Sequence, residues 1–114
     1  MQNRMRPIHP GEILREEYLT PLGMSANALA KALRVPANRV SGIVNETRAI
    51  TADTALRLSR YFGTSAEFWL SLQKTYELRT AERDLGAQIR REVKPAPGRE
   101  SYAVRAAKGT EEGR

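Results

Sequence analysis

The sequence contains no cysteine and a single histidine, His9, among its 114 residues. The lack of cysteine excludes disulfides and thiolate metal sites and suits a reducing compartment, so we expect a cytoplasmic protein. One histidine without an H-E-x-x-H pattern indicates no metal site. A phosphate-binding glycine loop and a nucleophile elbow are also missing. We therefore predict no metal, no cofactor and no catalytic residue, and we expect that the protein is not an enzyme.

Long hydrophobic runs and strand patterns are missing too. No apolar stretch approaches the roughly 20 residues that cross a bilayer, and the first residues lack the apolar segment of a secretory signal. No run of alternating apolar and polar residues is rich in β-branched side chains. We therefore expect no membrane partner and an all-α fold.

Positive charge is what the sequence has in excess. Its 19 Lys and Arg residues outnumber 13 Asp and Glu residues, which gives a net charge of +6 and a pI of about 10.2. This balance favours a polyanion such as nucleic acid, because cations that neutralise phosphates release counterions. The charge only supports such a partner, since many small basic proteins bind no nucleic acid.

Helical periodicity and capping residues predict one compact five-helix bundle within a domain at 9–93. The helices are expected at 9–19, 25–33, 36–44, 51–62 and about 66–85. Residues 1–8 are expected to form a flexible arm. Residues 94–114 are rich in proline, glycine and alternating charges, and we predict a disordered tail there.

Several helix boundaries carry specific expectations. His9 is interpreted as a capping or packing residue at the start of the first helix, which Pro21 and Gly23 are expected to end. Leu56 is predicted on the inward face of the fourth helix. Thr64 is expected to cap the fifth helix, because an acidic residue follows three positions later.

The most informative stretch runs from Ser25 to Asn45, where two short helical patterns are joined by a tight turn. Its apolar residues recur at helical spacing and can face one core: Leu29, Leu33, Val40, Ile43 and Val44. Ala30 lies where two helix axes are expected to cross. The second helix keeps polar residues on its outer face, as a helix in the DNA major groove does. The stretch therefore predicts a DNA-binding helix-turn-helix.

The outer face provides candidate DNA contacts. Asparagine can pair bidentately with adenine and arginine with guanine, so we predict base contacts from Asn38, Arg39 and either Ser41 or Ala37. Backbone contacts are predicted at the helix starts and in the following loop, from Ser25, Asn27, Arg48 and Thr51. Asn45 either contacts the backbone or only ends the helix. For all of these residues the alternative is a solvated surface.

The last helix clusters four apolar residues, Phe68, Trp69, Leu72 and Tyr76. Core packing must account for one or two of them. Because the cluster is broad, we predict that part of it packs against a second copy, as a dimer on a palindromic site requires.

Five segments of the chain together form a more specific pattern than a bare helix-turn-helix. They are H-P-G-E-I-L-R-E-E-Y-L at 9–19, L-A-K-A-L-R-V-P-A-N-R-V at 29–40, I-V-N at 43–45, R-A-I-T-A-D-T-A-L-R-L at 48–58 and F-G-T-S-A-E-F-W-L-S-L-Q at 62–73. With them the chain, over about residues 5 to 80, resembles the HigA-type antitoxins, a VapI-like branch of the Xre-family helix-turn-helix regulators. The resemblance implies a lambda-repressor-like fold.

The resemblance also implies a function. Antitoxins of this family neutralise a small RelE-like toxin that cleaves mRNA in association with the ribosome, and as dimers they bind and repress their own operon's promoter. The family's DNA-reading positions favour Asn38 and Arg39. We place the contact with the basic toxin on the N-terminal arm and the acidic first helix, around Ile13, Glu16, Glu17 and Leu19, with the tail from Lys94 as the alternative.

Two other functions stay open at this point: a solitary Xre-family regulator without a toxin, and a protein-interaction module that has lost DNA binding. One residue departs from the family pattern. Helix-turn-helix sequences usually carry glycine in the turn, where the backbone needs a positive φ, and this chain has Arg34.

Overall fold

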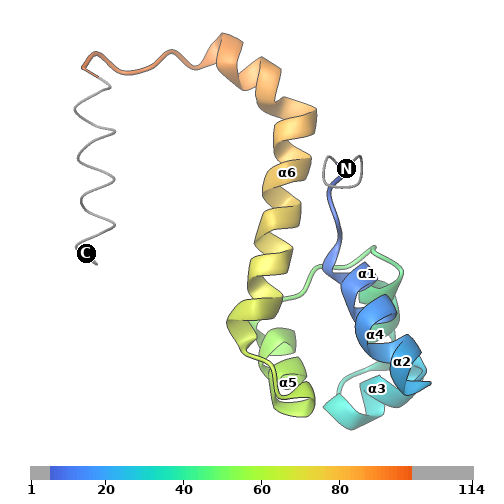
Figure 1. Cartoon of the computed structure of the whole chain (residues 1–114). Helices are drawn as coiled ribbons and strands as arrows, with labels where there is room; N and C mark the ends of the chain where they lie inside the picture. Colours follow the sequence, from blue (N-terminus) through green and yellow to red (C-terminus); the bar gives the residue numbers. More distant parts are fainter. Residues whose placement is uncertain (1–5, 99–114) are drawn as a thin grey trace. The chain divides into compact units, whose positions relative to one another are not determined.

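The computed structural model of the protein describes residues 6–98, all of them in helices or in short connecting segments, with no strand (Figure 1). The all-α prediction is confirmed for this range. The chain divides into two units, Met1–Arg83 and Asp84–Arg114. The predictions for residues 1–5 of the arm and 99–114 of the tail lie outside the described residues.

The first predicted helix is continuous from Pro10 to Leu22, in three segments: α1 (Pro10–Ile13), the π-helical η2 (Leu14–Leu19) and α2 (Thr20–Leu22). Pro21 therefore lies inside the helix, and the prediction that it ends the helix is wrong. Proline has no N–H and crowds the carbonyl four residues back. The π-helical pairing just before it, in which the Thr20 N–H reaches the carbonyl of Arg15, shifts the register by one residue. The helix ends at Gly23, where φ is 61°.

Four further helices complete the order: α3 (Ala26–Leu33), α4 (Ala37–Val44), α5 (Ala52–Phe62) and α6 (Ala66–Glu92). The predicted caps of α3 and α5 are confirmed. The Ser25 hydroxyl accepts a hydrogen bond from the N–H of Ala28 at 3.0 Å, and that of Thr51 accepts from the N–H of Thr54 at 3.4 Å. Gly63 ends α5 with a φ of 77°.

The cap of α6 differs from the prediction. Ser65, and not Thr64, precedes the helix and accepts a hydrogen bond from the Phe68 N–H at 3.0 Å. The Thr64 hydroxyl instead accepts from the Trp69 indole N–H at 2.7 Å. A buried indole needs an acceptor, and meeting that need moves the helix start by one residue.

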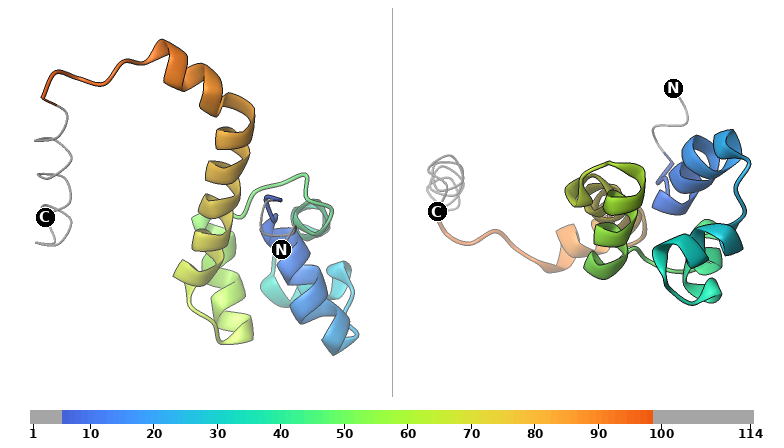
Figure 2. Two further views of the ribbon diagram at one scale, coloured as in Figure 1. Left: turned by 45° about the horizontal axis from the view of Figure 1, so that its top comes forward. Right: turned by 90° about the horizontal axis from the view of Figure 1, so that it is seen from below.

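In the first unit, side chains from η2, α3, α4, α5 and α6 and from the loop before α5 meet in one core. Its buried apolar residues are Leu14, Leu19, Leu29, Ala30, Leu33, Val40, Ile43, Ile50, Ala55, Leu58 and Trp69. Figures 1 and 2 show α5 beside the first turns of α6. Leu56 is 62% exposed, so the prediction that it faces inward is wrong. It lies one residue from Ala55 and two from Leu58, both buried, and the rotation of about 100° per residue turns it outward.

Helix α1 approaches the backbone of α4 very closely. A Cβ atom added to Gly11 would overlap the carbonyl oxygen of Ile43. Only glycine leaves room for this approach, which sets the position of α4 against the rest of the bundle.

Helix α6 runs seven residues past the predicted end at Leu85 and reaches Glu92. In the second unit nearly every described side chain is exposed, including those of Ile89 at 49% and Val93 at 64%. Residues 93–98, where the predicted tail begins, are not helical.

Candidate nucleic-acid interface

The C-terminal end of α4 is held by backbone and side-chain contacts. The Glu46 N–H donates to the carbonyl of Ile43 at 2.9 Å, and the Thr47 N–H donates to that of Gly42 at 2.8 Å. Together these two bonds form a Schellman motif, with Glu46 at a φ of 65°. From the first helix the Arg15 guanidinium donates to the carbonyl of Val44 at 2.7 Å. A cation at this negative end of the helix dipole stabilises it.

The loop that follows α4 is tied to α6 by a buried side chain. The amide oxygen of Gln73 accepts a hydrogen bond from the Ile50 N–H at 2.8 Å, and its amide nitrogen donates to Glu77 at 2.9 Å. Sequence reasoning missed Gln73. The signal was available, because Gln73 lies four residues after Trp69, on the inward face of α6.

His9 supports the same region, and its predicted role in capping and packing is confirmed. Its Nδ1 accepts a hydrogen bond from the Gly11 N–H at 2.8 Å, and its ring meets that of Tyr76 edge-on at 4.8 Å. Burial lowers the pKa of His9, while the charge of Glu46 and a hydrogen bond with the backbone of Arg48 oppose that shift. The neutral imidazole is the form that can accept from Gly11.

The N-terminal end of α4 is open by contrast. Pro36 precedes the helix without a side-chain cap, and the first turn contains no acidic residue. Ala37 and Asn38 are exposed, and helix geometry leaves their N–H groups without an intrahelical acceptor. These donors and the positive end of the helix dipole suit an anion such as a phosphate.

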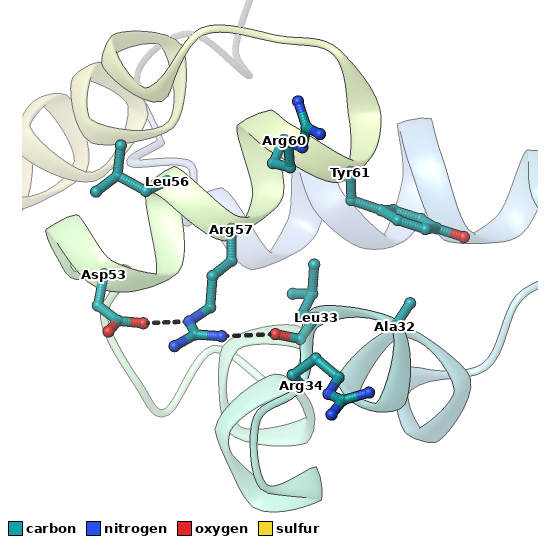
Figure 3. A pocket seen from close by; sticks show the side chains of 8 residues that line it. All are labelled: Ala32, Leu33, Arg34, Asp53, Leu56, Arg57, Arg60 and Tyr61. Carbon is teal, nitrogen blue, oxygen red and sulfur yellow. Dashed lines mark hydrogen bonds and ion pairs between the residues drawn. The ribbon is translucent and has the colours of Figure 1, made fainter.

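A network of charged side chains lies beside this open end. One carboxylate oxygen of Asp53, in the first turn of α5, accepts from Arg39 of α4 at 2.9 Å and from Arg57 at 2.7 Å. Arg57 also donates to the carbonyl of Leu33, the last residue of α3, at 2.9 Å (Figure 3). Hydrogen bonds from Arg57, and secondarily from Arg39, lower the pKa of Asp53. The network joins the end of α3, the start of α4 and the start of α5.

A hollow of about 620 Å³ lies over this network between α3 and α5 (Figure 3). Its lining combines apolar side chains with arginines, among them Leu56, Tyr61, Arg34 and Arg60.

The turn between α3 and α4 keeps the positive φ of a helix-turn-helix although it has no glycine. Arg34 has a φ of 64°. The Val35 N–H donates to the carbonyl of Ala30 at 3.0 Å, and the Arg34 N–H donates to that of Lys31 at 3.1 Å, so the turn is a second Schellman motif. A non-glycine residue in this conformation costs about 1 kcal/mol, and the turn absorbs that strain.

The predicted DNA-contact residues fall into two groups. Arg39 and Ser41 are half-buried. The others are exposed: Ser25, Asn27, Ala37, Asn38, Asn45, Arg48 and Thr51. Asn45 ends α4.

The bond between Arg39 and Asp53 holds the first turn of α4 beside the first turn of α5. Asp53 and Arg57 were missed, although their spacing of four residues is visible in the sequence.

The residues predicted to contact partner proteins need two corrections. Trp69 is fully buried and Leu19 is 4% exposed, so neither side chain is available to a dimer partner or to a toxin. Each fills the core of its own chain. Phe68 is 38% exposed, whereas Leu72, Tyr76 and Ile13 are half-buried; Glu16 and Glu17 are exposed.

Metal clusters and membrane-spanning helices are both absent from the described residues. Between residues 6 and 98 there is no group of three or more His, Cys, Asp or Glu side chains that could hold a metal ion. In the same range no helix has both the length and the apolarity needed to cross a membrane.

Comparison with known proteins places this chain in a family. The helix-turn-helix family model matches residues 14–69. Virulence-associated protein I of Dichelobacter nodosus is 63% identical over 83 residues, 73% of this chain and 77% of that protein. Antitoxin HigA-1 of Vibrio cholerae is 38% identical over 68% of this chain and 72% of its own. The structure of the Pseudomonas aeruginosa antitoxin HigA with the higBA promoter superposes with a TM-score of 0.79 at 54% identity, covering 81% of this chain and all of that one. The chain belongs to the HigA antitoxin family of helix-turn-helix proteins.

Proposed function

We propose that this protein is the antitoxin of a type II toxin-antitoxin system and that it represses its own operon by binding the promoter through α4. The observation that carries the proposal is the open N-terminal end of α4, which exposes Asn38 and two N–H donors beside Arg39. The likeness to an antitoxin whose structure was solved with promoter DNA supports it. A helix with this geometry can place its first residues against base edges.

The contacts divide into those that read sequence and those that position the protein. We assign base contacts to Asn38 and Arg39, assisted by Ala37 or Ser41. The start of α3 and the loop after α4 supply phosphate contacts, from Ser25, Asn27, Arg48 and Thr51. Gln73 and His9 hold the backbone of that loop and so support Arg48.

A homodimer is part of the proposal, because two helix-turn-helix units bind two half-sites of a palindrome. A groove of about 520 Å³ between residues 6–8, α1 and α6 supports an interface at this face. Apolar residues line much of it, including Ile8, Ile13, Phe68 and Leu72. With Trp69 in the core, Phe68 and Leu72 are the residues of the predicted cluster that can meet a second copy, and Tyr76 packs on His9.

We propose that the first helix neutralises a small basic RelE-like toxin. Glu16 and Glu17 are exposed on it, and neither lines the groove just described. Carboxylates suit a basic, RNA-cleaving partner. If toxin binding changes the affinity for DNA, DNA must change the affinity for toxin by the same factor.

The proposal is tested by measuring binding of the purified protein to the DNA upstream of its own gene and to a scrambled duplex over a range of salt concentrations. Tight, salt-sensitive and sequence-selective binding is expected. Arg48→Ala should weaken both duplexes alike and flatten the salt dependence. Weak binding to both duplexes by the wild-type protein would contradict the repressor function.

The antitoxin function needs a separate test with the product of the neighbouring gene. Formation of a stable complex that abolishes mRNA cleavage is expected. Selective binding to the upstream DNA without any neutralisation would identify a solitary regulator instead.

A further inference from the structure

Two arginines converge on a single oxygen atom at the edge of the predicted DNA-reading surface. Oδ1 of Asp53 accepts from Nη1 of Arg39 and from Nε of Arg57. Arg57 cannot move freely, because its Nη1 also bonds the carbonyl that ends α3 (Figure 3). The carboxylate is therefore fixed by α5 and by Arg57, and it in turn fixes the guanidinium of Arg39.

The bond to Nη1 leaves the other edge of the Arg39 guanidinium available. Within residues 6–98, the Arg39 side chain makes no second hydrogen bond, so the N–H groups of Nε and Nη2 stay available as donors. These two N–H groups point the same way in a rigid plane. The major-groove edge of guanine presents two acceptors, O6 and N7, that match such a pair.

The negative charge of Asp53 acts against a different use of the same arginine. A phosphate that approached Arg39 would also approach the carboxylate, whereas the neutral edge of a base meets much less repulsion. The ion pair is partly exposed, with Arg39 31% and Asp53 55% accessible, so DNA can reach it.

We propose that Asp53 is a positioning residue that makes Arg39 selective for a base edge over a phosphate. The inference rests on the proposed function, since it concerns how the same α4 surface reads DNA. Asp53 acts through Arg39 and contacts no base itself.

The test compares affinities for the upstream DNA and the scrambled duplex at one salt concentration. For Asp53→Asn we expect tighter binding to the scrambled duplex and a fall of about fivefold in the ratio of specific to non-specific affinity, near the low end of what one bidentate contact contributes. Glu46→Gln is the matched control. It removes a carboxylate at the other end of α4 that pairs with Arg15 and not with Arg39, so both affinities should rise together and their ratio should stay constant.

A second comparison separates positioning from a general effect of charge. In an Arg39→Ala background, Asp53→Asn should leave the ratio unchanged, because the residue that it positions is gone. Thermal unfolding of each variant shows whether the fold is kept, and Asp53→Glu should restore part of the selectivity.

Three results would overturn the inference. An unchanged ratio for Asp53→Asn in the wild-type background would do so, as would the same fall in the Arg39→Ala background or an equal fall for Glu46→Gln. If the wild-type protein binds both duplexes alike, the proposed function fails as well. Selective binding by the wild-type protein with any of the three results overturns only the role of Asp53.

Discussion

The two ends of α4 differ in how they are held. At the C-terminal end, the Schellman motif at Glu46, the guanidinium of Arg15 and the backbone of α1 at Gly11 all contact the last turn. At the N-terminal end there is no side-chain cap, and the first turn is joined to α5 by the ion pair between Arg39 and Asp53.

This difference shows how a short helix can present one end to a ligand. Eight residues alone do not form a stable helix in water, so α4 depends on tertiary contacts. The buried side chains of Val40 and Ile43, together with the contacts at the C-terminal end, fix the axis of the helix. The donors and the positive dipole of the other end then stay available in a fixed direction.

The largest expected effect comes from closing the space between α1 and α4. Gly11→Ala should lower the free energy of unfolding by about 3 kcal/mol, because its Cβ meets backbone that no rotamer change can move. Urea denaturation measures this loss. Gly23→Ala is the control, since it meets no neighbouring atom and carries only the strain of a positive φ, about 1 kcal/mol. Equal losses in the two variants would show that the close approach does not hold α4.

A smaller loss is expected when the loop after α4 is released. Gln73→Leu leaves the buried Ile50 N–H without an acceptor and should cost about 2 kcal/mol of stability. It should also weaken DNA binding, because the loop carries Arg48. Gln88→Leu, at an exposed position of α6, should change stability by less than about 0.5 kcal/mol. Similar values for both glutamines would contradict the role of Gln73.

The two turns that flank α4 should respond to glycine in the same direction. Arg34→Gly and Glu46→Gly each remove backbone strain of about 1 kcal/mol. Glycine also raises the conformational entropy of the unfolded chain, which offsets part of this gain in stability. We expect each variant to gain about 0.5 kcal/mol of stability, with the gain at Glu46 reduced by the loss of its 3.5 Å ion pair with Arg15. Calorimetry compares the melting temperature of each variant with that of the wild-type protein. A lower melting temperature for Arg34→Gly would contradict the claim that the backbone at Arg34 is strained.

The smallest effect is a pH dependence that arises from His9. Because its pKa is lowered in the folded state, the unfolded chain takes up the proton first as the pH falls. The His9 contribution is complete above about pH 6.5 and decreases as the pH falls below that value. The carboxyls of Glu12 and Asp53, whose pKa values are lowered, titrate in a more acidic range. Urea denaturation should therefore show that the free energy of unfolding decreases between pH 7 and 5.5, and His9→Asn should remove this decrease. If the pH dependence is unchanged in that variant, the decrease arises from another group.

Local signals in the sequence predicted much of the fold. Hydroxyl caps and apolar periodicity place α3, α4 and α5 within a residue of their observed bounds, because these features act between near neighbours. The cap of α6 was misplaced by one residue, since the hydroxyl of Thr64 serves the Trp69 indole. The π-helical segment before Pro21 was missed for a similar reason: it depends on how the whole helix accommodates the ring.

The candidate site was less predictable than the fold. Exposure of Asn38 and Arg48 follows from periodicity and loop position, which the sequence contains. The bond between Arg39 and Asp53 depends on the distance between α4 and α5, which only packing sets. Burial of Trp69 and Leu19 likewise depends on which apolar side chains the core can accommodate.

The claim that the open end of α4 reads DNA is tested most directly by comparing Arg39→Ala with Asn45→Ala, one substitution at each end of the helix. Affinities for the upstream and scrambled duplexes at fixed salt are the measurement. Arg39→Ala should lose about 1–3 kcal/mol on the upstream DNA alone, whereas Asn45→Ala should leave the specificity ratio unchanged. Equal losses of specificity at the two ends, or a loss confined to Asn45→Ala, would contradict the claim.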